Sequence, residues 1–176
     1  MSQKSVIRQL AEFATARGQE IGYENVFDYS LGNPSVPAPE DLAFHINYYA
    51  AVDTMSTHGY SPNPGIASVR EAVAKSLEKR FGLPSRKEHI FMASGAAGAL
   101  AHAFRLVTEP GDEILTFAPH FPEYHPYVDL TGAVLRVVPP DTDNFQVNLE
   151  KFYEMLTDKV MAVLIKTPNN PSGVVY

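Results

Sequence analysis

The chain has 176 residues, of which 45% are hydrophobic and 19% are charged, and its formal net charge is −6 at pH 7. This composition is ordinary for a globular domain that buries one core. An acidic balance without a Lys/Arg cluster argues against nucleic acid or an anionic membrane surface as a partner. Because the chain has no cysteine, disulfides, thiolate metal sites and a cysteine nucleophile are excluded.

The first twenty residues include several charged side chains, among them Lys4, Arg8 and Glu12. They therefore contain no apolar core of a signal peptide, and no long apolar run follows downstream. We expect a cytoplasmic protein that does not span a membrane.

The N-terminal third of the chain predicts helices joined by an irregular arm. Residues 1–18 carry apolar side chains at helical spacing, and Gly18 is expected to end this helix. Residues 28–39 contain three prolines, which favours an extended arm. Residues 40–51 and 66–81 are predicted helices, and Gly82-Leu83-Pro84 supplies a stop for the second one.

From His89 onward, short apolar runs alternate with helical patterns. Such β-α alternation predicts an α/β fold with a mainly parallel sheet. The expected strands are residues 90–93, 113–117, 133–138 and 160–165. The expected helices are residues 97–107, 122–130 and 149–156.

Small residues follow the first expected strand, in the run Ser94-Gly95-Ala96-Ala97-Gly98. Because these residues cannot cover their own N–H groups at the start of a helix, the turn is suited to binding a phosphate. The run matches neither the dinucleotide fingerprint nor the P-loop. The alternative is a tightly packed crossover in which small residues serve only close approach.

Two further turns follow strands and belong to the same edge of the sheet, where ligands of open α/β sheets bind. The first carries Phe121 and Tyr124, which either stack on a planar ligand or belong to the core. It also offers His120, Glu123 and His125 as metal ligands, but Pro122 disrupts a regular helical face and no fourth ligand is evident. We therefore predict no metal.

The second turn, Thr167-Pro168-Asn169-Asn170-Pro171-Ser172-Gly173, follows the last expected strand. The Asn170 amide either donates to a ligand oxygen or bonds within its own turn. Similarly, Tyr60 lies in a loop rich in turn-forming residues, and that loop either presents Tyr60 to a ligand or only precedes the next helix.

Together these motifs resemble the class I/II aminotransferases, which are fold type I enzymes dependent on pyridoxal 5′-phosphate. The resemblance rests on their order: Gly-Asn-Pro in the arm, Tyr-x-Pro-x-x-Gly, Ser-Gly-Ala-Ala-Gly-Ala-Leu, Pro-x-Phe-Pro-x-Tyr and Pro-Asn-Asn-Pro-Ser-Gly. It covers residues 5–176 and corresponds to the N-terminal portion of the family's chain. It implies that residues 1–39 form an N-terminal helix and arm. It also implies that residues 40–176 form the N-terminal part of the large domain, a three-layer α/β/α structure.

The resemblance also implies roles for individual residues. Gly95, Ala96 and Ala97 match the phosphate cup, although Ala97 stands where the family often has a hydroxyl or Lys side chain. Phe121 matches the aromatic residue stacked on the cofactor ring, and Tyr124 matches the residue that braces the cofactor's acidic partner.

Three further residues match family positions. Asn170 resembles the amide that bonds the phenolic oxygen of the cofactor, and Gly32 resembles the backbone group against the substrate carboxylate. Tyr60 resembles the tyrosine that reaches the cofactor phosphate of the neighbouring subunit in a homodimer. The family pattern also predicts cis peptide bonds at Ala118–Pro119 and Asn170–Pro171.

The resemblance implies transfer of an amino group between an amino acid and a 2-oxo acid. The Lys that forms the Schiff base and the acidic residue that holds the pyridinium proton lie beyond Tyr176 in the family pattern, and neither Lys159 nor Lys166 has the expected context. The 176-residue chain alone is therefore predicted to be inactive, with no catalytic residue of its own. The alternatives are a lyase of the same fold, such as a carbon–sulfur lyase, and a non-catalytic binding or dimerising module.

Overall fold

The computed structural model describes residues 6–32, 36–52, 54–140 and 143–176. The chain divides into two compact units, Met1–Ser61 and Pro62–Tyr176, which are considered separately below. The predicted domain boundary after residue 39 stays a prediction.

The first unit is helical. Its elements are α1 (Val6–Ile21), the short 3-10 helix η1 (Tyr23–Asn25), α2 (Leu42–Val52) and α3 (Thr54–His58). The described residues between 26 and 39 form neither helix nor strand, as the proline-rich sequence predicts.

The expected end of the first helix at Gly18 is wrong. The helix runs on to Ile21, and the Gly18 carbonyl accepts a hydrogen bond from the Gly22 N–H at 3.0 Å. Gly22, at φ 90°, follows the helix instead. Gly18 serves packing, because a Cβ at this position would collide with the ring of Tyr23.

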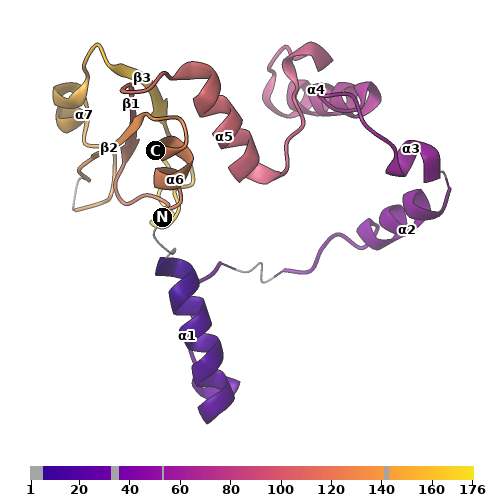
Figure 1. The fold of residues 1–176 in the computed structure, drawn as a ribbon, viewed down its shortest axis with the longest axis horizontal. Helices are drawn as coiled ribbons and strands as arrows, with labels where there is room; N and C mark the ends of the chain where they lie inside the picture. The colour runs from indigo at the N-terminus through magenta and orange to yellow at the C-terminus, as the bar shows by residue number, and fades with distance from the viewer. Residues whose placement is uncertain (1–5, 33–35, 53, 141–142) are drawn as a thin grey trace. The chain divides into compact units, whose positions relative to one another are not determined.

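The second unit alternates helices and strands, as predicted (Figure 1). Its elements are α4 (Ala67–Phe81), η2 (Lys87–His89), α5 (Gly95–Val107), β1 (Glu113–Phe117), α6 (Tyr124–Asp129), β2 (Val134–Val138), α7 (Leu149–Met155) and β3 (Val160–Leu164). Gly82 caps α4 in the left-handed conformation, and its N–H donates to the Glu78 carbonyl.

The three strands form one parallel sheet in the order β2-β1-β3. Helices cover both of its faces, so this unit has the predicted α/β/α layering, and α6 and α7 lie on opposite sides of the strands in Figure 1. On one face, residues of α5 and α6 pack on Ile114 and Leu135. On the other face, Phe152 and Met155 of α7 pack near Leu115 and Val138.

A β-bulge in β3 fixes which side chains face each layer. Glu113 pairs with Val160, but the next residue of β1, Ile114, pairs with Ala162, so Met161 is an extra residue. Val160 therefore packs with the α7 layer, whereas Ala162 packs with the layer of α5 and α6.

The predicted strand at residues 90–93 is wrong. These residues form no strand, and Phe91 remains 60% exposed. A strand needs a neighbour for its hydrogen bonds, but here the Met92 N–H donates to the Pro64 carbonyl and the Ile90 N–H donates to the Lys87 carbonyl. The apolar run alone could not reveal that no described segment pairs with it.

Both predicted cis bonds are confirmed, at Ala118–Pro119 and Asn170–Pro171, and Thr167–Pro168 is cis as well.

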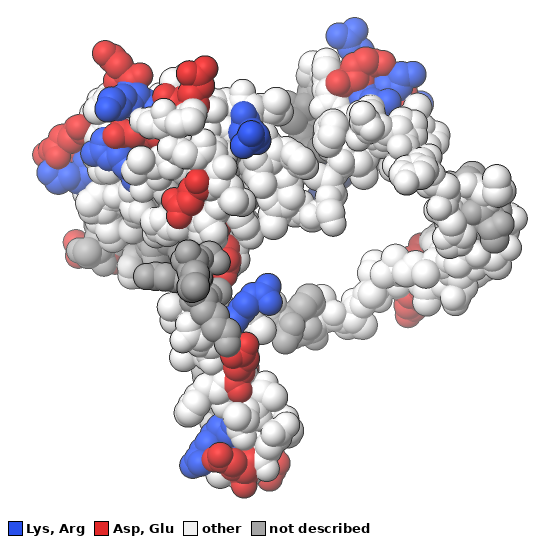
Figure 2. Space-filling model, viewed as in Figure 1, with Lys and Arg blue, Asp and Glu red and all other residues white. Residues whose placement is uncertain are grey.

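No helix among the described residues is both long and apolar enough to cross a bilayer. Acidic and basic side chains are interspersed on the visible face of α4 and of the strand-bearing region (Figure 2), which agrees with the absence of a basic cluster in the sequence.

Candidate functional site

Two turns meet beyond the carboxyl ends of β1 and β3, and Asn169 joins them. Its side-chain Nδ2 donates to the Pro119 carbonyl and to Ser172 Oγ, both at 2.9 Å. Its backbone N–H donates to the Val174 carbonyl, and its own carbonyl accepts from Gly173 at 2.7 Å. Since Asn169 is only 9% exposed, these bonds fix both turns at one edge of the sheet.

A cavity of ≈450 Å³ opens beside these turns and brings together most of the residues that the sequence singled out. Residues of α5, of the turn after β1, of α6 and of the end of β3 line it. They are Ala96, Ala97, Ala99, Leu100, Phe121, Tyr124, Tyr127, Leu164, Ile165, Lys166 and Asn170.

The N-terminus of α5 contributes Ala96 and Ala97 to the cavity wall. The first N–H groups of a helix have no partner within the helix, and the Ser94 side chain does not cap this one. Gly95 differs from expectation, because it does not line the cavity and its N–H already donates to the Ala93 carbonyl at 3.0 Å. Its φ of 72° suits glycine, which lets the chain turn into the helix.

Phe121 and Tyr124 line the cavity and also belong to the core, so the two alternatives considered from sequence are compatible. Their rings meet edge to face, with centroids 5.6 Å apart. Tyr124 is 6% exposed, and burial, followed by the nearby Tyr127, raises the pKa of its phenol. The cavity wall is thus an apolar surface with an aromatic edge.

Asn170 lies next to Asn169 but differs from it in burial and in hydrogen bonding. It is exposed and lines the cavity, and no hydrogen bond of its amide to another described residue is found. The self-bonded amide considered from sequence is therefore not observed at Asn170. Asn169 has that structural role, and sequence reasoning missed it because two adjacent asparagines in one turn look alike.

His120 and His125 approach each other at the same turn, with their Nε2 atoms 3.2 Å apart. Burial, and then the neighbouring His125, lowers the pKa of His120. Among the described residues, no group of three or more His, Cys, Asp or Glu side chains is placed to hold a metal.

Gly32 and Tyr60 belong to the first unit, so their positions relative to this cavity are not described. Within their own unit both are exposed, Tyr60 completely. The roles predicted for them remain predictions.

The two lysines near β3 are placed differently. The backbone carbonyl of Lys159 accepts a hydrogen bond from the Glu113 N–H at the amino end of the strand. Lys166 lies at the carboxyl end and lines the cavity. Sequence reasoning considered Lys166 only as a Schiff-base candidate, although its position directly after an apolar strand was the available signal for a cavity residue.

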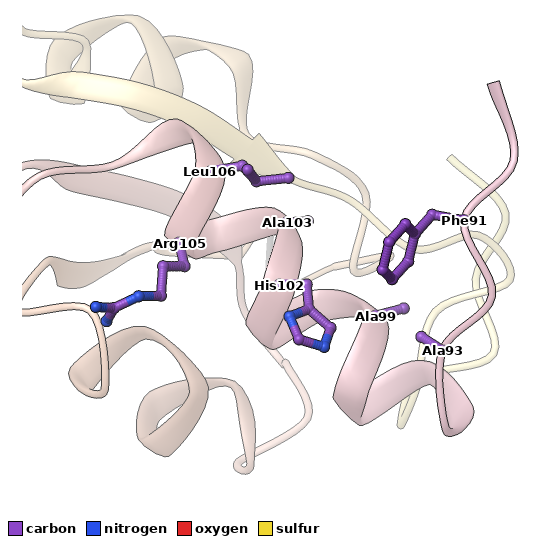
Figure 3. Close-up of a pocket in the computed structure, with 7 residues that line it drawn as sticks. All are labelled: Phe91, Ala93, Ala99, His102, Ala103, Arg105 and Leu106. Carbon is purple, nitrogen blue, oxygen red and sulfur yellow. The ribbon is translucent and has the colours of Figure 1, made fainter. Parts of the chain in front are cut away.

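A second cavity of ≈480 Å³ lies on another side of α5. Phe91 faces His102, with ring centroids 6.1 Å apart, and Arg105 extends away from Phe91 (Figure 3). The residues that line this second cavity are largely alanine, phenylalanine and leucine, and none of them is among the residues predicted for the site.

Comparison with known proteins identifies the family. The profile described as aminotransferase class I and II matches residues 24–176. The chain belongs to this family. It is 34% identical to an aspartate aminotransferase of Thermotoga maritima over 154 residues, which are 87% of this chain and 40% of that protein. It is also 34% identical to aromatic-amino-acid aminotransferase 2 of Thermococcus litoralis, covering 99% of this chain and 43% of that protein.

Solved structures agree with the assignment. A crystal structure of an aminotransferase from Eubacterium rectale superposes with a TM-score of 0.93 at 39% identity, covering 99% of this chain and 44% of the other. The predicted family and fold class are thereby confirmed. The chain spans about 40% of the length of the curated relatives named above.

Proposed function

We propose that this chain supplies part of the cofactor site of an aminotransferase that moves an amino group between an amino acid and a 2-oxo acid. The observation that carries the proposal is the ≈450 Å³ cavity, where residues matching the family's cofactor contacts come together from three separate segments. The relatives named above are aminotransferases for aspartate and aromatic amino acids, which supports an amino acid and its oxo acid as substrates.

The donor groups and surfaces of the cavity fit pyridoxal 5′-phosphate. The uncapped start of α5 suits a phosphate group, and the aromatic edge of Phe121 suits a planar ring. The amide of Asn170, which has no bond to another described residue, suits a phenolic oxygen. When bound, this cofactor acts as an electron sink that stabilises negative charge at the substrate carbon.

In this proposal each segment has a separate task. Backbone N–H groups of Ala96 and Ala97 bind the phosphate, and Gly95 shapes the turn that presents them. Phe121 holds the ring from one side and Tyr124 braces the site. Asn170 donates to the phenolic oxygen and so orients the ring. None of these side chains moves a proton of the substrate.

The rest of the proposed assembly comes from the family resemblance. We propose a cytoplasmic homodimer in which Tyr60 reaches the phosphate site of the neighbouring subunit and Gly32 lies against the substrate carboxylate. The full exposure of Tyr60 within its unit is compatible with a contact to another subunit. Twofold dimers are also the commonest assembly among soluble oligomers.

The test uses protein expressed from the complete reading frame. Absorbance titration with pyridoxal 5′-phosphate and an amino-group transfer assay should show saturable binding and turnover, and Asn170→Ala should shift the absorbance of the bound cofactor and slow the transfer. The 176-residue chain alone should show no turnover. A full-length protein that binds no cofactor would contradict the proposal, as would a 176-residue chain that turns over with a stoichiometric borohydride-stable adduct on Lys159 or Lys166.

A lyase of the same fold is the second candidate, because the described cofactor contacts do not differ between the two reactions. Product analysis separates them. Transfer yields a new amino acid from the added 2-oxo acid, whereas a carbon–sulfur lyase releases a thiol and ammonia without one.

A further inference from the structure

Among the described residues that line the ≈450 Å³ cavity, Lys166 is the one with a charged side chain. The cavity's other lining residues are alanine, leucine, isoleucine, phenylalanine and tyrosine, together with the neutral Asn170. Lys166 is exposed although it lines this apolar wall, so its ammonium is accessible to an anionic group of a ligand that occupies the cavity.

No described carboxylate lies within ion-pair distance of the Lys166 ammonium, in contrast to Arg136 and Lys151 of the same unit. Arg136 reaches Glu113 at 2.8 Å, and Lys151 reaches Glu154 at 2.7 Å. Lys166 therefore brings an uncompensated positive charge to the cavity. The strand just before it is held in place because Leu164, two residues earlier, accepts a hydrogen bond through its carbonyl from Thr116 Oγ1 at 3.0 Å.

The surroundings strengthen any interaction that this charge makes. Burial raises the pKa of Tyr124 on the same wall, which indicates a poorly hydrated environment. Attraction between opposite charges is stronger where water is excluded. A bound ligand that covers the wall would exclude still more water.

We infer that Lys166 is an anion-binding residue of this cavity, whose ammonium pairs with an anionic oxygen group of the bound ligand. The inference rests on the proposed function, in which that ligand is a pyridoxal phosphate. Two of its groups carry the required charge, the phosphate and the ionised phenolic oxygen. Lys166 and Asn170 line the same cavity, so the charge of Lys166 adds to the donor that Asn170 supplies.

The experiment uses full-length protein stripped of cofactor and three ligands that lack the aldehyde, so that no lysine can react covalently. They are 4-deoxypyridoxine 5′-phosphate, the same compound with its phenolic oxygen methylated, and 4-deoxypyridoxine without phosphate. Dissociation constants are measured by calorimetry for the wild type, Lys166→Gln and Lys166→Arg. Lys159→Gln is the matched control, because that lysine lies at the opposite end of β3.

Lys166→Gln should weaken binding of 4-deoxypyridoxine 5′-phosphate by about 5- to 10-fold, as expected for losing a charge-assisted contact. Lys166→Arg should retain most of the affinity, and Lys159→Gln should match the wild type. For a ligand that lacks the oxygen group paired with Lys166, Lys166→Gln and the wild type should bind equally. The ligand with which the difference in affinity disappears therefore identifies the phosphate or the phenolic oxygen as the partner. Added salt should narrow the difference between wild type and Lys166→Gln.

Equal affinity of Lys166→Gln and wild type for all three ligands would overturn this role and leave the proposed cofactor site standing. If the wild type binds none of the ligands, the proposed cofactor site itself is wrong. Urea unfolding of Lys166→Gln should match the wild type because the side chain is exposed, so a loss of affinity cannot be attributed to misfolding.

Discussion

The sheet of the second unit and the helices of the first unit carry similar apolar patterns but use them differently. Ile114, Leu115, Val128 and Val138 have no exposed surface. In α1, Leu10 and Phe13 remain 53% and 68% exposed although they stand at helical spacing. The sheet finds its partners within about fifty residues of sequence, whereas Leu10 and Phe13 stay exposed within the first unit. An apolar pattern therefore predicts a helix but not what the helix packs against.

The strongest test of this contrast substitutes the same residue type in both regions. Leu115→Ala should lower the free energy of unfolding by about 2–5 kcal/mol, because it opens a cavity in a closed core. Leu10→Ala should change it by less than about 0.5 kcal/mol, as for an exposed site. Urea unfolding of the 176-residue chain measures both. Equal losses would show that α1 is buried in solution.

A second test compares the adjacent asparagines. Asn169→Ala removes two side-chain hydrogen bonds from a buried amide and should cost about 1–3 kcal/mol of unfolding free energy. Asn170→Ala should leave stability nearly unchanged, since its exposed amide makes no bond to a described residue. Asn170→Ala should, however, weaken ligand binding. Thermal unfolding with and without cofactor separates the two effects, and a stability loss at Asn170 similar to that at Asn169 would contradict the assignment.

These two tests also mark how far the sequence could predict the fold and the site. The three strands were predicted within one residue at each end, because each is a short apolar run bounded by turns. The turns after the strands 113–117 and 160–165 were expected at one edge of the sheet, because parallel strands end at the same edge, and Phe121, Tyr124 and Asn170 line one cavity there. Residues 90–93 failed because strand formation depends on a partner, which local composition does not encode. The structural role of Asn169 was missed because it depends on which of two adjacent amides points toward the Pro119 carbonyl.

The smallest effect is expected between β1 and β2, where Arg136 Nη1 donates to Glu113 Oε2 at 2.8 Å. This hydrogen bond, assisted by the charge of Arg136 and by Thr157, lowers the pKa of Glu113 below its ordinary 4.5 despite partial burial. The ionised carboxylate therefore stabilises the fold above that pH, and this contribution is lost as the pH falls below about 4.5 through the folded-state pKa.

Glu113→Gln should remove that part of the acid dependence and cost about 1 kcal/mol or less at neutral pH, as for other partly exposed pairs. Unfolding free energies at pH 7 and pH 3.5 measure it, with Lys151→Gln as a control on the more exposed pair with Glu154. A variant whose acid dependence equals that of the wild type would show that Glu113 does not contribute.

The bulge at Met161 determines which face of the sheet each later residue of β3 lies on. In a regular strand every second side chain lies on the same face, so Ala162 and Leu164 would share the face of Val160, which packs in the layer of α7 and away from the cavity. The single extra residue inverts this parity, so Leu164 lines the cavity wall together with the residues just after the strand. The one extra residue therefore decides which side chains after it face the cavity. Deleting Met161 should abolish ligand binding although Met161 is not among the residues proposed to touch the ligand.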